Sequence, residues 1–147
     1  MKIVVVSDSH RQQELLEEIV ISTKADYYLH AGDSCLPAVL LEPFISVRGN
    51  CDFYSYPLEL VVNYSDVKIF LHHGHLYSIR QMVKKAQQND CKIVIYGHTH
   101  IPNLEQIDGI YVLNPGSISY PRGGSNRSYA VINIKSPQEI SFYFVNL

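Results

Sequence analysis

The sequence lacks the features that define several broad classes of protein. No apolar run approaches the ~18–20 residues that a membrane-spanning helix needs. The apolar start, residues 1–6, is too short for a signal peptide and meets Asp8 almost at once. No run of lysines or arginines forms a basic stripe, and the formal net charge is −2. We therefore expect a cytoplasmic protein with no membrane contact and no basic nucleic-acid surface.

Cysteine is also scarce. The three cysteines, Cys35, Cys51 and Cys91, are odd in number and none are spaced as CxxC. This pattern argues against a disulfide framework and against a thiolate zinc site. The chain also has no internal repeat, no low-complexity segment and no linker, while 46% of its residues are hydrophobic. A chain of 147 residues with this composition predicts one globular domain, residues 1–147, with a proper core.

The pattern that is present is an alternation of strand-like and helix-like stretches. Residues 2–7 form a short, β-branched apolar run, typical of a strand covered on both faces. Residues 11–23 carry apolar side chains at helical spacing, which predicts an amphipathic helix. Further helices are predicted at 35–41 and 79–89, and further strands at 26–30, 44–48, 58–64, 67–72, 92–96, 104–107, 111–113, 127–134 and 139–145. This βαβ start and strand-rich finish predict an α/β domain with two packed sheets and outer helices.

Side chains that can bind a metal follow five of these strands. In "IVIYGHTH" a buried strand runs into Gly97 and then presents His98 and His100. The other strand-end residues of this kind are Asp8, His10, Asp33, Asn50 and His73. In open α/β sheets the functional crevice lies outside the carboxyl ends of the strands. These residues are therefore expected to meet in one place.

Each of these residues also has a plain structural interpretation. A strand-end aspartate often caps a helix or stabilises a turn, and a lone histidine is usually a hydrogen-bonded polar group. Such interpretations would have to hold independently at every position and would leave the shared edge unexplained. We therefore interpret the seven as metal ligands. Seven exceed one tetrahedral site with an open position, so two ions sharing the Asp33 carboxylate are expected, with Gly32 allowing close backbone approach.

Five short motifs occur in order along the chain: Asp8-x-His10, Gly32-Asp33, Gly49-Asn50-Cys51-Asp52, His73-Gly74-His75 and Gly97-His98-Thr99-His100. The sequence "NPGS" at residues 114–117, followed by Pro121-Arg122, closes the series. The ordered set resembles the calcineurin-like metallophosphoesterase superfamily. Its ending resembles the small YfcE-type phosphodiesterase branch. A single element such as HxH is a weak signal, whereas the ordered set is a specific one.

The resemblance implies a four-layer αββα sandwich of two mixed β-sheets flanked by helices. It implies that one ion is held by Asp8, His10 and His100, and the other by Asn50, His73 and His98. Asp33 would bridge the two ions together with a water or hydroxide that attacks phosphorus in line. This oxygen and nitrogen ligand set suits Mn²⁺, the first expectation, and also Ni, Fe, Zn or Mg, better than Ca²⁺.

The chain departs from the family pattern at Cys51. Many relatives carry a histidine there, which is thought to protonate the leaving group. We take Cys51 as the candidate catalytic residue; a thiol is a poorer proton donor, so phosphodiesters with good leaving groups are favoured. The alternative, that Cys51 only packs and takes no part in the chemistry, stays open. The expected substrate is a small phosphodiester or nucleotide-like molecule, with Arg11 and His75 as candidate contacts to it. Leu36 replaces the second acid of the GDxxD pattern, which removes no proposed ligand.

Rival interpretations come from other classes of protein. The retromer scaffold subunit resembles these enzymes but is regarded as a non-catalytic protein–protein scaffold, with an eroded catalytic pattern. This chain keeps His10 and every other proposed ligand, which favours an enzyme. Amidohydrolases also use HxH, but on a barrel of about 250 residues. A metallo-β-lactamase pattern would continue HxHxDH, which this chain does not. Association into a homo-oligomer is left open.

Overall fold

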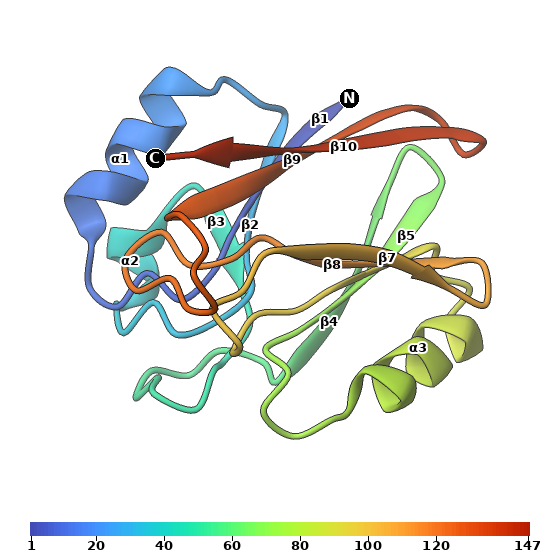
Figure 1. Cartoon of the computed structure of the whole chain (residues 1–147), viewed down its shortest axis with the longest axis horizontal. Coiled ribbons are helices and arrows are strands. Elements are labelled where there is room, and N and C mark those ends of the chain that lie inside the picture. Colours follow the sequence, from blue (N-terminus) through green and yellow to red (C-terminus); the bar gives the residue numbers. More distant parts are fainter.

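In the computed structural model, which describes residues 1–147, the strands form two five-stranded sheets (Figure 1). The first sheet has the order β10-β9-β1-β2-β3. Strands β1, β2 and β3 run parallel, β9 pairs antiparallel with β1, and β10 pairs antiparallel with β9. The bounds are Lys2–Val6 for β1, Tyr27–His30 for β2, Phe44–Ser46 for β3, Ser128–Ser136 for β9 and Glu139–Asn146 for β10.

The second sheet has the order β4-β5-β6-β8-β7. Its central strands β5, β6 and β8 run parallel, and the outer strands β4 and β7 pair antiparallel with their neighbours. The bounds are Glu59–Tyr64 for β4, Val67–His72 for β5, Ile93–Ile95 for β6, Asn103–Ile107 for β7 and Ile110–Asn114 for β8. Both sheets are thus mixed, as the family resemblance implied.

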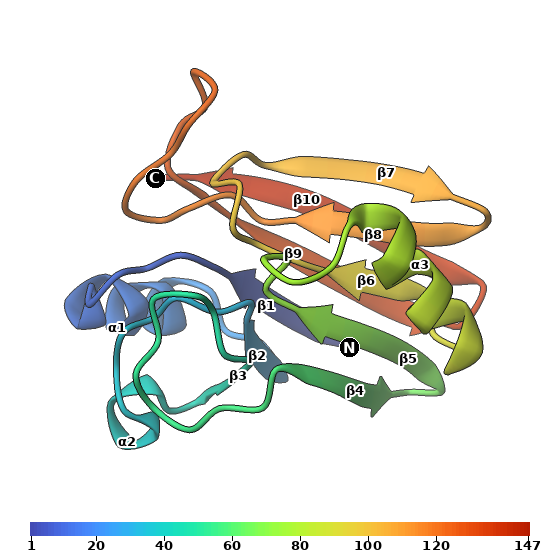
Figure 2. The same cartoon turned by 90° about the horizontal axis from the view of Figure 1, so that it is seen from below.

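The helices cover the outer faces of the two sheets (Figure 2). Helices α1 (Gln13–Ser22) and α2 (Ala38–Leu41) pack on the first sheet, and α3 (Ile79–Gln88) packs on the second. Ser78 and Gln81 begin α3 with a capping box, which satisfies backbone N–H groups at its start. The expected four-layer α/β sandwich is therefore confirmed. No helix is long and apolar enough to cross a membrane.

Strand β1 shows how the sequence pattern produces these layers. Successive side chains of a strand point to opposite faces. Ile3 and Val5 enter the core between the sheets, while Val4 and Val6 pack under α1 and α2. All four are completely buried. A continuous apolar run therefore forms a strand covered on both faces, as predicted, and it delivers the polar residues that follow it to the edge of the core.

Two predicted helices begin later than expected, and both for the same reason. The helix predicted at 11–23 starts at Gln13, and the one predicted at 35–41 starts at Ala38. Arg11 and Cys35 adopt left-handed backbone conformations, with φ of 69° and 57°. Such residues cannot continue a right-handed helix. The residues just before both helices instead shape loops at the carboxyl ends of β1 and β2.

Candidate metal centre

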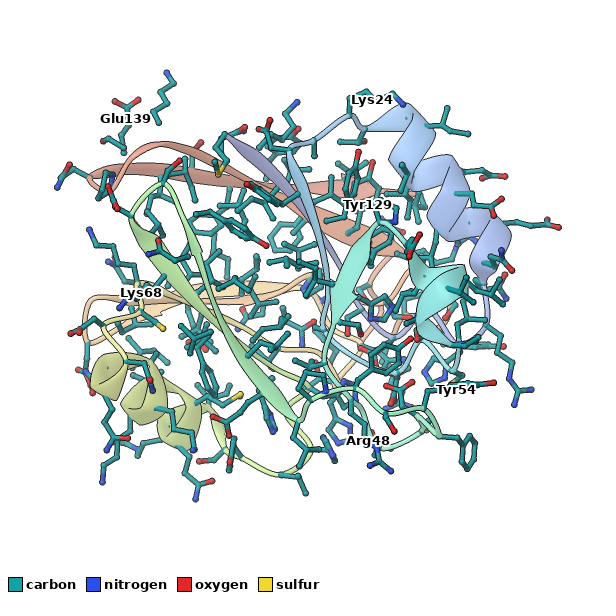
Figure 3. All side chains as sticks on the ribbon, turned by 180° about the vertical axis from the view of Figure 1, so that it is seen from behind. Lys24, Arg48, Tyr54, Lys68, Tyr129 and Glu139 are labelled. Atoms are coloured by element: carbon teal, nitrogen blue, oxygen red, sulfur yellow. The ribbon has the colours of Figure 1, made fainter.

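The seven predicted ligands lie together at the carboxyl ends of strands from both sheets. Asp8 and His10 follow β1, Asp33 follows β2 and Asn50 follows β3. His73 follows β5, and His98 and His100 follow β6. Lys68, the second residue of β5, lies well apart from Arg48, which stands two residues before Asn50 (Figure 3). The site therefore lies at one end of the sandwich, where the two sheets meet.

Asp8, His10 and His100 form what we call the first ligand group. Their ligand atoms all lie within 4.8 Å of one another. Nε2 of His100 is 3.3 Å from Oδ1 of Asp8, and the ring centroids of His10 and His100 are 5.4 Å apart. This group joins the loop after β1 of the first sheet to the loop after β6 of the second.

Asn50, His73 and His98 form the second ligand group. Oδ1 of Asn50 is 3.0 Å from Nε2 of His73 and 3.2 Å from Nδ1 of His98. The two histidine rings have centroids 5.2 Å apart. One amide oxygen and two imidazole nitrogens therefore face a common point.

Asp33 lies between the two groups. Its Oδ2 is 3.3 Å from Nε2 of His73 in the second group. A carboxylate oxygen of Asp33 also lies within 4.8 Å of ligand atoms of Asp8 and His73. A carboxylate oxygen of Asp33 likewise lies within 4.8 Å of ligand atoms of His10 and Cys51. A carboxylate has two oxygens to divide between neighbours, so this position suits a shared ligand.

The backbone at the site is held in an unusual conformation. Five of the seven residues have positive φ, between 44° and 70°: Asp8, His10, Asp33, His98 and His100. Non-glycine residues adopt this region rarely, at a cost of about 1–3 kcal/mol each, and such strain concentrates at functional sites. Oδ2 of Asp8 accepts the backbone N–H of His98 at 3.0 Å and the hydroxyl of Ser7 at 2.6 Å. A side chain at Gly97 would collide with Ser7, so this close approach requires glycine.

Two histidines are oriented by backbone carbonyls. Nδ1 of His73 donates to the carbonyl of Ala31 at 2.8 Å, and Nδ1 of His100 donates to that of Tyr120 at 2.6 Å. Because a carbonyl only accepts, Nδ1 of each ring carries a proton, and Nε2 of each ring is directed at a carboxylate, that of Asp33 for His73 and that of Asp8 for His100. Metal-ligating histidines are fixed in this way in proteins generally.

The carboxylate of Asp52 holds the loops after β2 and β3 together through hydrogen bonds, a role that the sequence did not predict. It accepts backbone N–H groups from Asp33, Cys35 and Gly49 at 2.7–2.9 Å. The backbone N–H of Cys51 in turn donates to Oδ1 of Asp33 at 2.8 Å. The available signal was an acid placed two residues after a proposed ligand, in "GNCD".

The electrostatics of the site fit divalent cations. Oδ1 of Asp8 and Nε2 of His10 are buried and have no hydrogen-bond partner, which is costly for polar atoms unless something else binds them. Burial would raise the pKa of the Asp8 carboxyl, but contacts with His100 and His73 outweigh it and lower that pKa. Burial likewise opposes ionisation of Asp33, and His73 lowers its pKa below the usual range. Two ionised carboxylates beside imidazole nitrogens are a ligand set for borderline metals.

A cavity of about 530 Å³ opens beside the ligand groups. Its walls include the predicted substrate residue Arg11 and the predicted catalytic residue Cys51; the remaining lining residues are His10, Cys35, Asn50, Phe53 and Tyr120. Burial and the neighbouring Asp33 carboxylate raise the pKa of the Cys51 thiol, which keeps it protonated. His75 is not on this wall. Its ring lies 5.3 Å from that of His73 and 6.4 Å from that of His98, and its contact with substrate stays a prediction.

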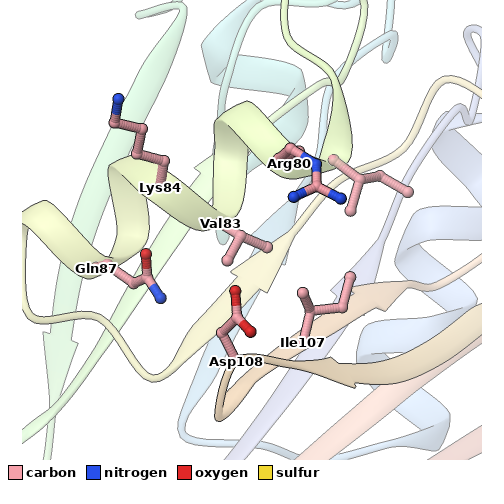
Figure 4. Close-up of a pocket in the computed structure, with 7 residues that line it drawn as sticks. Arg80, Val83, Lys84, Gln87, Ile107 and Asp108 are labelled. Atoms are coloured by element: carbon pink, nitrogen blue, oxygen red, sulfur yellow. The ribbon is translucent and has the colours of Figure 1, made fainter.

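A second cavity of similar size, about 520 Å³, lies between α3 and the turn that joins β7 to β8 (Figure 4). Arg80 and Lys84 border it on the helix side and Asp108 on the turn side. It contains none of the seven predicted ligands. The candidate chemistry therefore belongs to the cavity that Cys51 lines.

Comparison with known proteins gives a family match over most of the chain. The family model described as "Calcineurin-like phosphoesterase superfamily domain" matches residues 1–137. The probable metallophosphoesterase YsnB of Bacillus subtilis is 36% identical over 147 aligned residues, which cover 92% of this chain and 86% of YsnB. The phosphodiesterase YfcE of Escherichia coli is 38% identical over 98 residues, which cover 60% of this chain and 52% of YfcE.

Solved structures share the fold. A predicted phosphoesterase from Streptococcus pneumoniae superposes with a TM-score of 0.84 at 34% identity, covering 98% of this chain and 97% of the other. A Vps29 from Entamoeba histolytica, solved with Zn²⁺, superposes with a TM-score of 0.75 at 22% identity, covering 99% of each chain. The second likeness is one of fold alone.

Proposed function

Since this chain belongs to the calcineurin-like phosphoesterase superfamily, we propose that it is a metal-dependent phosphodiesterase with a dinuclear centre. The observation that carries the proposal is the convergence of seven ligand side chains from both sheets, with Oδ1 of Asp8 and Nε2 of His10 buried without a hydrogen bond. Two such polar atoms, one of them on a residue that lines the cavity, are best accounted for by a bound cation.

In this proposal each ligand group holds one ion. Asp8, His10 and His100 hold the first, while the second ligand group holds the other and Asp33 is shared. When bound, the two ions supply positive charge for the phosphate oxygens and lower the pKa of water. Mn²⁺ is the metal we would test first, since the donor set of carboxylate, amide and imidazole favours it over Ca²⁺.

The residues of the chain itself set the substrate preference. Arg11, on the cavity wall, is placed to contact a phosphate oxygen through its planar guanidinium. Cys51, on the same wall, is the candidate proton donor to the leaving oxygen. A thiol with a raised pKa protonates an alkoxide poorly, so esters whose leaving group is acidic are favoured. Aryl phosphodiesters meet this condition, and the relative YfcE is named a phosphodiesterase.

The test is hydrolysis by purified, chelator-treated protein with one divalent metal added at a time. Bis(p-nitrophenyl) phosphate should be cleaved with Mn²⁺, and p-nitrophenyl phosphate more slowly. Metal analysis of the Mn²⁺-loaded protein should give two ions per chain. Alkyl monoesters cleaved as fast as the aryl diester would contradict the argument from Cys51.

The alternative is a metal-binding scaffold without catalysis, as the fold is shared with Vps29. An absence of phosphoester hydrolysis with Mn²⁺, Ni²⁺, Fe²⁺, Zn²⁺ and Mg²⁺, in protein shown to hold metal, would favour this alternative. Retention of all seven candidate ligands favours the enzyme.

A further inference from the structure

Phe53 is the most exposed large hydrophobic side chain of the protein. It is 85% exposed, on the segment between β3 and β4, and it lines the cavity beside the ligand groups. A phenyl ring in this position buries almost nothing in the folded chain. Its segment is nevertheless anchored, because Cys51 and Asp52 just before it bond to the backbone and side chain of Asp33. The ring therefore lines the cavity on a segment that hydrogen bonds hold in place.

Tyr120 provides a second aromatic ring on the same cavity. It is 59% exposed and lies edge-on to the ring of His10, with centroids 5.7 Å apart. Its backbone carbonyl accepts the Nδ1 hydrogen of His100. Two aromatic side chains from separate segments therefore border the cavity, and each segment is bonded directly to a ligand residue.

Three of the five arginines of the chain belong to segments that border this cavity. Arg11 lines the cavity, Arg48 precedes the Gly49-Asn50 pair, and the backbone N–H of Arg122 donates to the carbonyl of His100 at 3.0 Å. All three are exposed, and none forms an ion pair with a carboxylate. In a chain of net charge −2, this is a local excess of guanidinium groups. Arginine matches phosphate oxygens in a planar, two-pronged geometry.

Resting on the proposed phosphodiesterase activity, we infer that the substrate is a nucleoside phosphodiester whose base stacks on Phe53. Every nucleobase has a π-face that an exposed aromatic ring can stack on, and Arg11 on the same cavity wall is placed to bind a phosphate oxygen. The cavity of about 530 Å³ is in the usual range for small-molecule sites. A single nucleotide fits these features better than a polymer does, since the chain has no continuous basic stripe.

The test uses two esters with the same leaving group, thymidine 5′-(p-nitrophenyl phosphate) and methyl p-nitrophenyl phosphate. Since p-nitrophenolate leaves from both, the ratio of their kcat/KM values reports binding of the nucleoside. The wild-type ratio should favour the thymidine ester by about fivefold or more, the lower end of what one stacked base contributes. Phe53→Ala should bring the ratio near one. Phe53→Tyr should keep most of it, and Phe53→Leu, which is apolar but has no π-face, should not.

Tyr143→Ala is the matched control, because Tyr143 is an exposed aromatic residue on β10, 43% exposed and outside the cavity. It should leave the ratio unchanged. Equal kcat/KM values for the two esters in the wild type, or an unchanged ratio in Phe53→Ala, would overturn the inference while leaving the phosphodiesterase proposal intact.

If neither ester is cleaved with any metal, the proposed activity itself fails. Calorimetric binding of thymidine 5′-monophosphate to the metal-loaded protein then decides the inference alone. Binding that Phe53→Ala weakens by about fivefold or more would support it. No binding, or equal binding to both proteins, would overturn it.

Discussion

The carboxylate of Asp52 accepts the backbone N–H of Asp33, with 2.9 Å between Oδ2 and N. The same carboxylate, in a residue only 4% exposed, also accepts the N–H groups of Gly49 and Cys35. Three backbone donors from the loops after β2 and β3 thus converge on one buried group. Asp52 contacts no candidate metal position through its side chain, yet it fixes the loop that carries the shared ligand.

Replacing Asp52 should therefore affect both stability and metal binding. Asp52→Ala leaves three N–H groups without this partner, two of them in buried hydrogen bonds, which should lower the free energy of unfolding by about 2–4 kcal/mol. Loss of support behind a ligand typically weakens metal binding by about 10–100-fold. Urea unfolding of metal-free protein and metal titration would measure the two effects separately.

Asp26 offers a matched control for Asp52. Its carboxylate also accepts a backbone N–H, that of Lys2 at 2.7 Å, but at an exposed position away from the site. Asp26→Ala should cost about 1 kcal/mol or less and leave metal affinity unchanged. Equal metal affinity in Asp52→Ala and Asp26→Ala would show that Asp52 does not position the shared ligand.

The chemistry of Cys51 predicts a dependence on the leaving group. Cys51→Ser should lower hydrolysis of an aryl diester by only about threefold, because p-nitrophenolate departs without a proton. Cys51→His should raise hydrolysis of an alkyl ester by about tenfold or more, since imidazolium is a competent acid near neutral pH. Steady-state rates over a series of leaving groups would measure this. A uniform effect of Cys51→His on all esters would remove Cys51 from the role of proton donor.

Much of this arrangement could be predicted from the sequence, because the same pattern, an apolar run followed by a polar residue, indicates both a strand and a ligand. The apolar runs of β1 and β6 are short and uninterrupted, that of β5 is broken only by Lys68, and a ligand residue follows each strand within three residues. Parallel strands bring their carboxyl ends to one edge of a sheet. The position of each ligand residue just after a predicted strand was therefore enough to predict that the seven lie together.

Other features had no local signal. The left-handed conformations of Arg11 and Cys35 shortened two predicted helices, and they arise from contacts between loops that are distant in sequence. The role of Asp52 likewise depends on the loops after β2 and β3 lying side by side. The exposure of Phe53 could not be predicted either, because an isolated phenylalanine in a sequence is usually buried.

His30 predicts how the stability of the metal-free protein depends on pH. Its ring is completely buried, and burial lowers its pKa to about 4, whereas the nearby carboxylates of Asp52 and Asp8 only partly oppose this. It accepts the N–H of Gly32 through Nδ1 and therefore donates to Ser9 through Nε2, an arrangement that requires neutral imidazole. The pKa in the unfolded chain is about 6.5.

Between pH 6.5 and about 4 the unfolded chain therefore binds a proton that the folded chain excludes. The contribution of His30 to stability is complete above pH 6.5 and is lost as the pH falls toward 4. From pH 7.5 to 5.0 this amounts to about 2 kcal/mol. His30→Gln should lose about that much less over the same interval, as measured by urea unfolding in chelator. An identical pH dependence in His30→Gln and wild type would contradict the assignment.

His98 and His100 should each control the occupancy of one metal position. They are two residues apart, but His98 faces Asn50 in the second ligand group and His100 faces Asp8 in the first. Each single alanine variant should therefore keep about one ion per chain where the wild type keeps two. Asp33→Ala should lower the occupancy of both positions, because the shared carboxylate is lost. Activity toward an aryl diester should fall by roughly 100-fold or more in all three variants.

Thr99→Ala provides the control between the two histidines. The hydroxyl of Thr99 accepts the Asn114 amide and the N–H of Ile101, and it belongs to neither ligand group. This variant should lose some thermal stability but keep two ions per chain. The histidine variants should instead lose metal but keep their thermal stability. The buried apolar side chains of β6 stabilise the fold, whereas His98 and His100 follow the strand and lie outside its core. Metal analysis together with thermal unfolding distinguishes the two outcomes. Wild-type rates of aryl diester hydrolysis in His98→Ala or His100→Ala would show that this histidine is not a metal ligand.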